Sequence, residues 1–244
     1  MSKGVMLVIG GNRGIGGATA RKAARRGYTV ALTYASSPHE AATVVRDIET
    51  EGGSARAIPC DVADESEIVS LFDKAAELGP LAAMVYSSGI TGPASPLAEV
   101  SGETLRDVIA INLTGAMLCA RESVKRLSTR YGGKGGSITF ISSRASDRGS
   151  SGEYVWYAAS KGGVNSLSIG LSREVAQEGI RVNCVSPGPV DTGMLSAERQ
   201  VRGAAAVAMG RVAEPSEIAD AVIYLASDEA SYVTGANLAV AGGA

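Results

Sequence analysis

Short apolar runs along the chain alternate with longer segments in which apolar residues recur every three or four positions. This alternation is typical of repeated βα units that build a parallel sheet. The predicted strands are Val5–Ile9, Thr29–Thr33, Ala55–Cys60, Ala82–Ser87, Ile138–Ser142, Arg181–Ser186 and Asn237–Ala241. The predicted helices are Ile15–Arg26, Pro38–Glu51, Glu65–Leu78, Thr104–Tyr131, Tyr157–Glu178 and Ser216–Ala226. Ala41, Val44 and Ile48 show the apolar stripe that such a helix lays on a sheet.

No linker rich in proline or serine and no internal repeat divides the sequence. We therefore predict one α/β domain over residues 1–244, a doubly wound Rossmann fold with a seven-stranded parallel sheet and helices on both faces. Ligands of such sheets bind at the carboxyl ends of the strands. Residues 188–210 have weak periodicity and many small side chains, and we expect them to form a substrate lid over that edge.

Charge and cysteine content narrow the partners. The 23 basic and 25 acidic residues give a net charge of -2, so no basic field indicates nucleic acid and no polybasic block indicates a membrane surface. The run Val5–Ile9 is too short for a membrane span, and we expect a cytoplasmic protein. Cys60, Cys119 and Cys184 lie far apart in apolar stretches, which favours buried free thiols over a metal site.

A glycine cluster, Gly10 to Gly16, directly follows the first strand and opens the first helix. Glycines permit a tight turn and let a pyrophosphate approach the helix N-terminus, where free N–H groups favour an anion. The spacing is GxxxGxG rather than the general GxGxxG, so a purely structural turn is the alternative. The position after the first strand favours dinucleotide binding.

The next strand predicts which nicotinamide cofactor is used. Dinucleotide sites that take NAD(H) usually place an acidic residue about 20 positions after the turn, on the ribose hydroxyl. No Asp or Glu lies between Arg26 and Glu40, whereas Arg13 is in the turn and Tyr34 and Ser36 follow the second strand. A cation and hydroxyls suit a 2′-phosphate, which favours NADP(H). If Arg13 is only a solvated charge, NAD(H) is possible as well.

Tyr157 and Lys161 are four residues apart and share one helix face. A free tyrosine titrates near 10, and a neighbouring ammonium favours the phenolate, so the pair makes a workable acid/base. Alone, such a pair is more often a surface feature. Ser143, just after a strand at the carboxyl edge, and Asn112, a polar residue in an apolar helix that needs a partner, strengthen the functional interpretation.

Several motifs in order now give the sequence a family resemblance from Val5 to Gly243. The motifs are Gly10–Gly16, Cys60-Asp61-Val62, Ile111-Asn112-Leu113-Thr114-Gly115, Tyr157–Lys161, Ser186–Thr192, Gly210–Pro215 and Tyr232–Gly235. The sequence resembles the short-chain dehydrogenase/reductase family, in its branch of 3-oxoacyl carrier-protein reductases and sugar dehydrogenases.

The resemblance implies roles for four residues. Tyr157 would exchange a proton with the substrate oxygen, which Ser143 would hold by a hydrogen bond. Lys161 would bind the nicotinamide ribose and bias Tyr157 towards phenolate, and Asn112 would hold a water of the proton relay. The implied cofactor contacts are Gly10, Asn12, Arg13, Gly14, Ile15, Gly16, Tyr34, Ser36, Asp61, Val62, Ser88, Gly89, Tyr157, Lys161, Pro187, Gly188, Val190 and Thr192. Among them, Asp61 and Val62 would lie by adenine.

The sequence departs from the family pattern in four places. Ile9 stands where threonine is frequent, so one local hydrogen bond is expected to be missing. Tyr86-Ser87-Ser88-Gly89 replaces Asn-Asn-Ala-Gly, which puts the asparagine contacts in doubt. The stretch from Ser143 to Tyr157 is one residue longer than usual, which leaves Ser142 as an alternative to Ser143. Ala241 replaces a frequent acid.

The leading functional hypothesis is an NADP(H)-dependent oxidoreductase that interconverts a secondary alcohol and a ketone or aldehyde, with a small polyol or sugar-like substrate slightly favoured. A 3-oxoacyl-[acyl-carrier-protein] reductase is the alternative, with Arg130 and Arg173 meeting the acidic carrier protein. A non-catalytic NADP-binding sensor is a hypothesis of another class. The resemblance also implies a homotetramer. Predicted pocket residues are Arg144, Ser146, Glu153, Tyr154, Trp156 and the segment from Met194 to Gln200.

Overall fold

A seven-stranded parallel sheet is the centre of the molecule. The computed structural model describes residues 3–193 and 197–244. The strands are β1 (Val5–Ile9), β2 (Thr29–Tyr34), β3 (Ala55–Pro59), β4 (Leu81–Tyr86), β5 (Gly136–Ile141), β6 (Ile180–Pro187) and β7 (Asn237–Val240). Their order, β3-β2-β1-β4-β5-β6-β7, is that of a doubly wound Rossmann fold, so the predicted fold class is confirmed.

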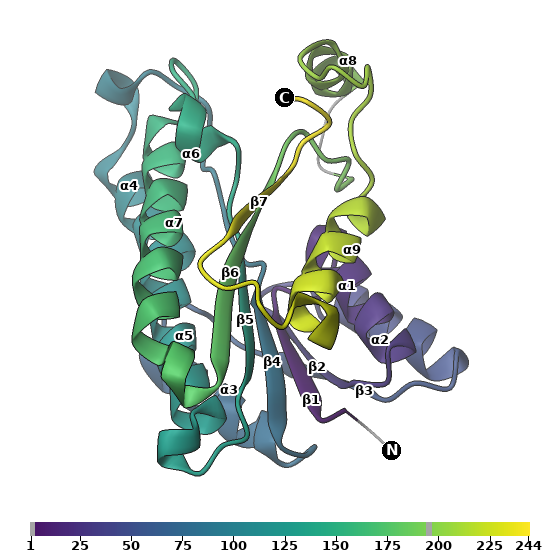
Figure 1. Cartoon of the computed structure of the whole chain (residues 1–244). Coiled ribbons are helices and arrows are strands. Elements are labelled where there is room, and N and C mark those ends of the chain that lie inside the picture. Colours follow the sequence, from purple (N-terminus) through teal and green to yellow (C-terminus); the bar gives the residue numbers. More distant parts are fainter. Residues whose placement is uncertain (1–2, 194–196) are drawn as a thin grey trace.

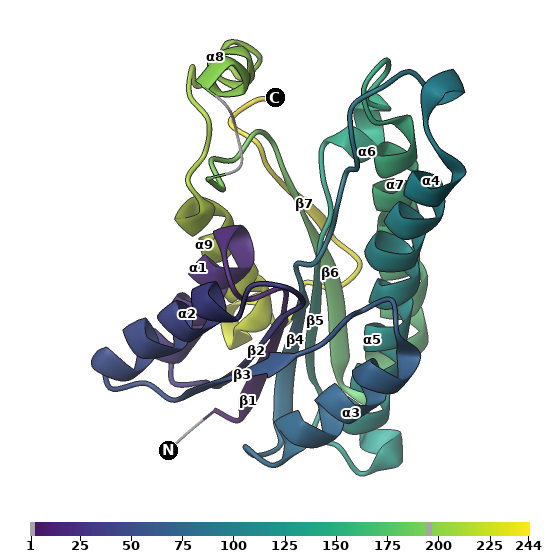
Figure 2. The ribbon, with the colours of Figure 1, turned by 180° about the vertical axis from the view of Figure 1, so that it is seen from behind.

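Helices cover both faces of the sheet (Figures 1 and 2). One face carries α1 (Gly14–Arg25), α2 (Pro38–Thr50) and α9 (Pro215–Ala226). The other carries α3 (Glu65–Ala76), α4 (Gly102–Ile109), α5 (Gly115–Leu127) and α7 (Val155–Val175). Along β1, Leu7 packs into one buried cluster and Val8 into the other. Both faces of the strand are therefore buried, which explains why its sequence is continuously apolar.

The predicted helix Thr104–Tyr131 is wrong as a single element. It consists of α4, a π-helical turn over Ala110–Thr114, α5 and a 3-10 turn over Thr129–Tyr131. A π turn inserts a single residue into a helix, and a one-residue change in the spacing of apolar positions is too small for periodicity to assign. Space beside the turn is made by Gly115, where a Cβ atom would lie 2.6 Å from the Tyr86 hydroxyl.

Shorter helical elements were not predicted. They are α6 (Ala145–Arg148), α8 (Ala197–Ala205) and the 3-10 turns Leu97–Glu99, Ala176–Glu178 and Asp228–Ala230. The helix α8 lies beyond the carboxyl edge of the sheet, near the C-terminus (Figure 1). Its Arg202 forms an ion pair of 2.7 Å with Glu153, in the loop that precedes α7.

Two further expectations bear on the fold. The three cysteines are buried and free, as predicted. Within the described residues, no helix combines the length and the apolar character that crossing a membrane requires.

Candidate active site

The glycine turn between β1 and α1 is closed so tightly that side chains do not fit. A Cβ atom on Gly16 would lie 2.0 Å from the carbonyl oxygen of Gly10, and both Gly10 and Gly14 have positive φ angles. Among the described residues, no side chain caps the start of α1. Its first N–H groups can therefore receive a pyrophosphate, and the turn fits a dinucleotide. Beside Ile9, Gly10 N–H donates to the Thr33 hydroxyl at 2.9 Å.

Both polar side chains of this turn face α2. Asn12 Nδ2 donates to Glu40 Oε2 at 2.9 Å, and Arg13 Nη1 lies 3.8 Å from Glu40 Oε1. Glu40 is thus a residue of the site that the sequence analysis passed over, because it follows the end of β2 by six positions. The signal for it was its place in the first turn of the helix that follows β2. Tyr34 is half-buried at the end of β2, and Ser36 is exposed just beyond it.

Segments from across the sheet converge on one glycine. A Cβ atom on Gly89, after β4, would lie 3.3 Å from Asn112 Oδ1 and 3.4 Å from Lys161 Nζ. Two other glycines of this edge also lie close to residues from distant segments. A Cβ atom on Gly10 would contact Ser88, and one on Gly14 would contact Thr192. The ends of β1, β4 and β6, the π turn and α7 therefore meet at the carboxyl edge, where a Rossmann fold binds its ligand.

The remaining predicted cofactor residues make contacts elsewhere along the carboxyl edge and in the core, rather than with Gly89. Asp61 is exposed, and its carboxylate accepts from Ala63 N–H at 2.9 Å. The Val62 side chain is buried in the core. Gly188 packs against Ala241 at the end of β7, and Val190 bridges to Ala213. Ile15 packs on the α1 side of the core, and Pro187 ends β6.

Asn112 is fully buried in the π turn, and its side chain makes three hydrogen bonds within the described part of the chain. Its Oδ1 accepts from Ile90 N–H at 2.8 Å, and its Nδ2 donates to the Ile90 carbonyl at 2.9 Å and to Ser160 Oγ at 3.0 Å. The Ser160 hydroxyl in turn donates to the Tyr157 carbonyl at 2.7 Å. The predicted need for a partner is confirmed. Ser160, inside the Tyr157–Lys161 motif, was missed as the link.

Lys161 is a buried ammonium held by a neutral partner. Its side chain is almost fully inaccessible, and Nζ donates to the Ile141 carbonyl at 2.8 Å. Nothing in the described part of the chain forms a salt bridge with it. Burial lowers the pKa of Lys161 to about 8. The group therefore exchanges protons close to neutral pH.

Tyr157 and Ser143 face one another across the start of α7. Burial raises the pKa of Tyr157, and a hydrogen bond from Ser143 opposes that rise. The Lys161 Nζ lies 5.7 Å from the centre of the tyrosine ring, but burial is the larger influence on this pKa. Ser142 is the less suitable serine, since its hydroxyl is buried and directed at the Lys161 carbonyl at 3.3 Å.

Tyr86 joins the end of β4 to the π turn. Its side chain is buried at the end of β4, and its hydroxyl donates to the carbonyl of Ile111, inside the π turn. Burial raises the pKa of Tyr86 well above its usual value, so the hydroxyl stays protonated and remains a donor. The neighbour of Asn112 is thereby fastened to the central strands.

The predicted pocket residues are largely engaged with the protein itself. Arg144 pairs with Asp147, and the Ser146 hydroxyl donates to the Ser143 carbonyl at 2.7 Å. Trp156 Nε1 donates to the Thr91 carbonyl at 2.7 Å, and the Tyr154 ring packs edge-on against Trp156. The residues Met194–Ser196 lie outside the described part of the chain. Gln200, the last predicted pocket residue, donates to Asp191 at 3.2 Å.

Proteins of known family resemble this chain over nearly its whole length. Residues 9–244 match the family model described as enoyl-(acyl carrier protein) reductase. The chain is 44% identical to the uncharacterized oxidoreductase YgfF of Escherichia coli (strain K12), over 98% of this chain and 99% of that protein. It is 38% identical to cis-4-hydroxycyclohexanecarboxylate dehydrogenase of Sinomonas cyclohexanicum, over 98% of this chain and 95% of that protein.

Two further similarities concern an acyl substrate and a bound cofactor. The 3-oxoacyl-[acyl-carrier-protein] reductase FabG of Staphylococcus aureus (strain N315) is 34% identical over 97% of this chain and 96% of that protein. A blue fluorescent protein from a metagenomic library, solved in complex with NADPH, superposes with a TM-score of 0.91 at 34% identity, over 99% of this chain and 98% of that chain.

The fold, the site and these similarities define a nicotinamide-dependent oxidoreductase that acts on a small molecule. The chain belongs to the short-chain dehydrogenase/reductase family.

Proposed function

We propose that this chain is an NADP(H)-dependent oxidoreductase that interconverts a secondary alcohol and a ketone or aldehyde, with Tyr157 as the general acid/base. The observation that carries the proposal is the convergence at Gly89, where Asn112 and Lys161 approach the same point at the carboxyl edge. The hydrogen bond between Ser143 and Tyr157 adds two hydroxyls to that edge. Arg13 in the glycine turn supports NADP(H) over NAD(H).

In this mechanism the bound nicotinamide supplies or accepts the hydride. The glycine turn and the start of α1 hold the pyrophosphate, and Lys161 holds the nicotinamide ribose. Ser143 orients the substrate oxygen, and Tyr157 exchanges the proton with it. Asn112 fixes the loop at Ile90 and, through Ser160, the first turn of α7. The relative positions of Tyr157 and Lys161 are thereby held while the proton moves.

The variant Tyr157→Phe tests this mechanism. It removes the proton-exchanging hydroxyl and nothing of the glycine turn, so we expect turnover to fall at least about 10³-fold while NADPH binding persists. The measurements are NADPH absorbance with a carbonyl panel and fluorescence titration of NADPH. Tyr131→Phe, an exposed tyrosine outside this site, is the matched control and should leave turnover unchanged. Turnover of Y157F within a few-fold of the parent would refute the mechanism.

The polar side chains of Arg144, Ser146 and Glu153, between β5 and α7, support a small polyol or sugar-like substrate. The similarity to cis-4-hydroxycyclohexanecarboxylate dehydrogenase supports it as well. The alternative is a 3-oxoacyl-[acyl-carrier-protein] reductase, supported by the similarity to FabG and by Arg130 and Arg173 as contacts for a carrier protein. A panel of sugars, ketones and 3-oxoacyl thioesters, each with NADPH and NADH, separates the two. A non-catalytic NADP-binding sensor would bind NADPH and turn over none of them.

We also propose a homotetramer. A groove of about 440 Å³ runs between α5 and α7 and is lined by Leu113, Met117 and Leu167, and β7 forms an exposed edge of the sheet. Second copies covering these surfaces would bury apolar area. Light scattering that reports a monomer would contradict this assembly.

Within each subunit, residues 1–244 act as one cofactor-binding domain, and residues 188–210 act as the substrate lid. The free thiols fit a cytoplasmic location.

A further inference from the structure

The two polar side chains of the cofactor turn share a single acidic partner. Asn12 Nδ2 donates to Glu40 Oε2 at 2.9 Å, and Arg13 Nη1 lies 3.8 Å from Glu40 Oε1. The Arg13 and Glu40 side chains are 52% and 42% exposed. Solvent, and hence a ligand, can therefore reach both charges.

The carboxylate enters this edge of the sheet from an unusual element. Acids that bind an adenosine ribose usually come from the end of the second strand, and the 2′-phosphate is taken by an arginine. Here the end of β2 and the residues after it, Tyr34 to Ser37, carry no acid. Glu40, from the first turn of α2, brings a carboxylate to the same arginine.

The carboxylate of Glu40 has opposite effects on a ribose with a 2′-phosphate and on a ribose with a free 2′-hydroxyl. A 2′-phosphate carries close to two negative charges and needs donors, and the donors Asn12 and Arg13 are already turned to Glu40. The carboxylate also repels the phosphate, although solvent screens the repulsion. A free 2′-hydroxyl is itself a donor, and it gains an acceptor in Glu40.

We propose that Glu40 is a specificity-determining residue that weakens the preference for the 2′-phosphate and lets the site accept NAD(H) beside NADP(H). The inference rests on the proposed nucleotide site. It goes beyond that site by assigning the cofactor preference to a competition between Arg13, which favours the phosphate, and Glu40, which favours the free hydroxyl. Removing Glu40 should therefore strengthen the preference for the 2′-phosphate. Removing Arg13 should weaken it.

Calorimetric titration with ADP-ribose and 2′-phospho-ADP-ribose tests this without any hydride transfer. We expect Glu40→Gln, which keeps the size of the side chain but not its charge, to bind 2′-phospho-ADP-ribose about fivefold more tightly. Affinity for ADP-ribose should fall about twofold. Arg13→Gln should weaken the phosphorylated ligand about tenfold and leave ADP-ribose nearly unchanged. Glu51→Gln, which breaks the exposed pair with Arg25, is the matched control and should change neither affinity.

The ratio of the two affinities decides the outcome. A ratio in E40Q within twofold of the parent value overturns the role of Glu40 while leaving the nucleotide site intact. A parent protein that binds neither ligand overturns the proposed function as well. Glu40→Ala is the second variant, and a shift in the same direction as in E40Q supports the assignment. If E40A and E40Q shift the ratio in opposite directions, the inference is overturned.

Discussion

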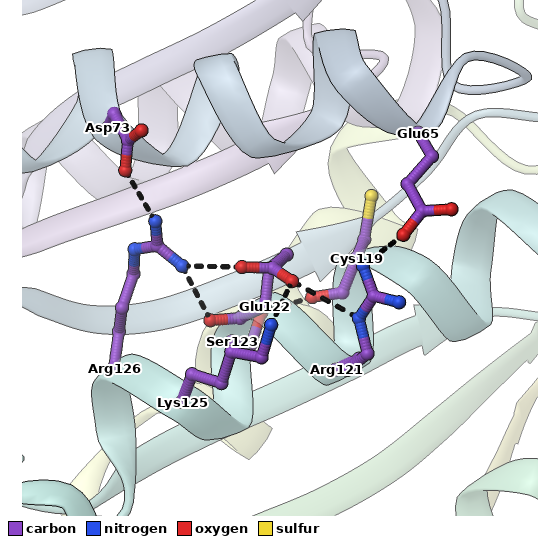
Figure 3. Close-up of polar contacts among 8 residues, drawn as sticks. All are labelled: Glu65, Asp73, Cys119, Arg121, Glu122, Ser123, Lys125 and Arg126. Atoms are coloured by element: carbon purple, nitrogen blue, oxygen red, sulfur yellow. Dashed lines mark hydrogen bonds and ion pairs between the residues drawn. The ribbon is translucent and has the colours of Figure 1, made fainter.

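Two buried charges in this molecule are treated in opposite ways. Glu122 of α5 is almost fully buried and accepts from Lys125 at 2.7 Å, Arg126 at 2.9 Å and Arg121 at 3.1 Å (Figure 3). Glu65 and Asp73 of α3 hold two of these cations from outside. Lys161 of α7 is as deeply buried, yet its ammonium has the Ile141 carbonyl as its hydrogen-bond partner.

The pKa values of the two groups express this difference. Burial by itself would raise the pKa of Glu122, but the hydrogen bonds from Lys125 and Arg126 outweigh it, and the pKa is lowered. The carboxylate is thus fixed in its charged form. Burial lowers the pKa of Lys161 to about 8, and the opposing effect of Cys184 is too small to restore it. A compensated buried charge serves stability, whereas an uncompensated one keeps a proton available for chemistry.

The largest expected effect comes from replacing the uncompensated charge. Lys161→Met should lower kcat/KM about 10³-fold, because it removes the group that we propose to hold the ribose beside Tyr157. The same variant should be about 2 kcal/mol more stable than the parent at pH 7, because it no longer buries an ammonium. Steady-state assays and urea unfolding measure the two quantities. Lys125→Met is the control and should leave turnover unchanged.

The stability gain should depend on pH in a defined direction. Folding lowers the pKa of Lys161 from 10.5 to about 8, so between these values the unfolded chain binds more protons. The penalty of the buried ammonium is fully present below about pH 8 and is relieved as the pH rises towards 10.5. The difference between K161M and the parent should therefore shrink over that interval. A constant difference would contradict the idea that Lys161 is an uncompensated charge.

Replacing the compensated charge, Glu122, should lower stability and leave turnover nearly unchanged. Glu122→Gln should lower the free energy of unfolding by about 2 kcal/mol at pH 7 and leave turnover within twofold, because three cations lose their shared partner far from the site. The lowered pKa of Glu122 means that this contribution is present above pH 4.5 and disappears as the pH falls through the folded value. Glu65→Gln, an exposed member of the same network, should cost under about 0.5 kcal/mol. Equal losses of unfolding free energy in E122Q and E65Q would contradict the idea that the buried carboxylate carries the stability of this network.

The smallest effect is expected at Tyr86, which joins the sheet to the π turn. Tyr86→Phe leaves the Ile111 carbonyl without its donor, so we expect a loss of about 1 kcal/mol in unfolding free energy and a fall of about fivefold in kcat. Tyr28→Phe is the matched control, since that hydroxyl lies 3.4 Å from its acceptor and outside the site. An unchanged kcat in Y86F would show that the π turn holds Asn112 without help from the tyrosine.

The sequence predicted β1, β2, β4, β5 and β6 well because they are largely buried and read as short apolar runs between turns. The edge strands β3 and β7 are more exposed. It could not reveal the π turn at Asn112, since a single inserted residue changes the apolar spacing by only one position. It grouped Ser143, Tyr157 and Lys161 through chain order, yet it could not show that Ser160 links Asn112 to Tyr157, because that contact depends on how α7 rotates against the turn. Glu40 escaped for a similar reason, since helix α2 folds back towards a turn 28 residues earlier.

The buried cysteines tie the redox behaviour of the protein to its conformation. Burial raises the pKa of the Cys60 thiol to about 12 and that of Cys184 to about 11, and it raises the pKa of Cys119 as well. Thiolate is the form that reacts with oxidants, and the folded chain offers almost none of it. Oxidative damage to these sulfurs must therefore wait for local or global opening. The oxidation of these three sulfurs is consequently governed by opening of the fold rather than by thiolate in the folded chain.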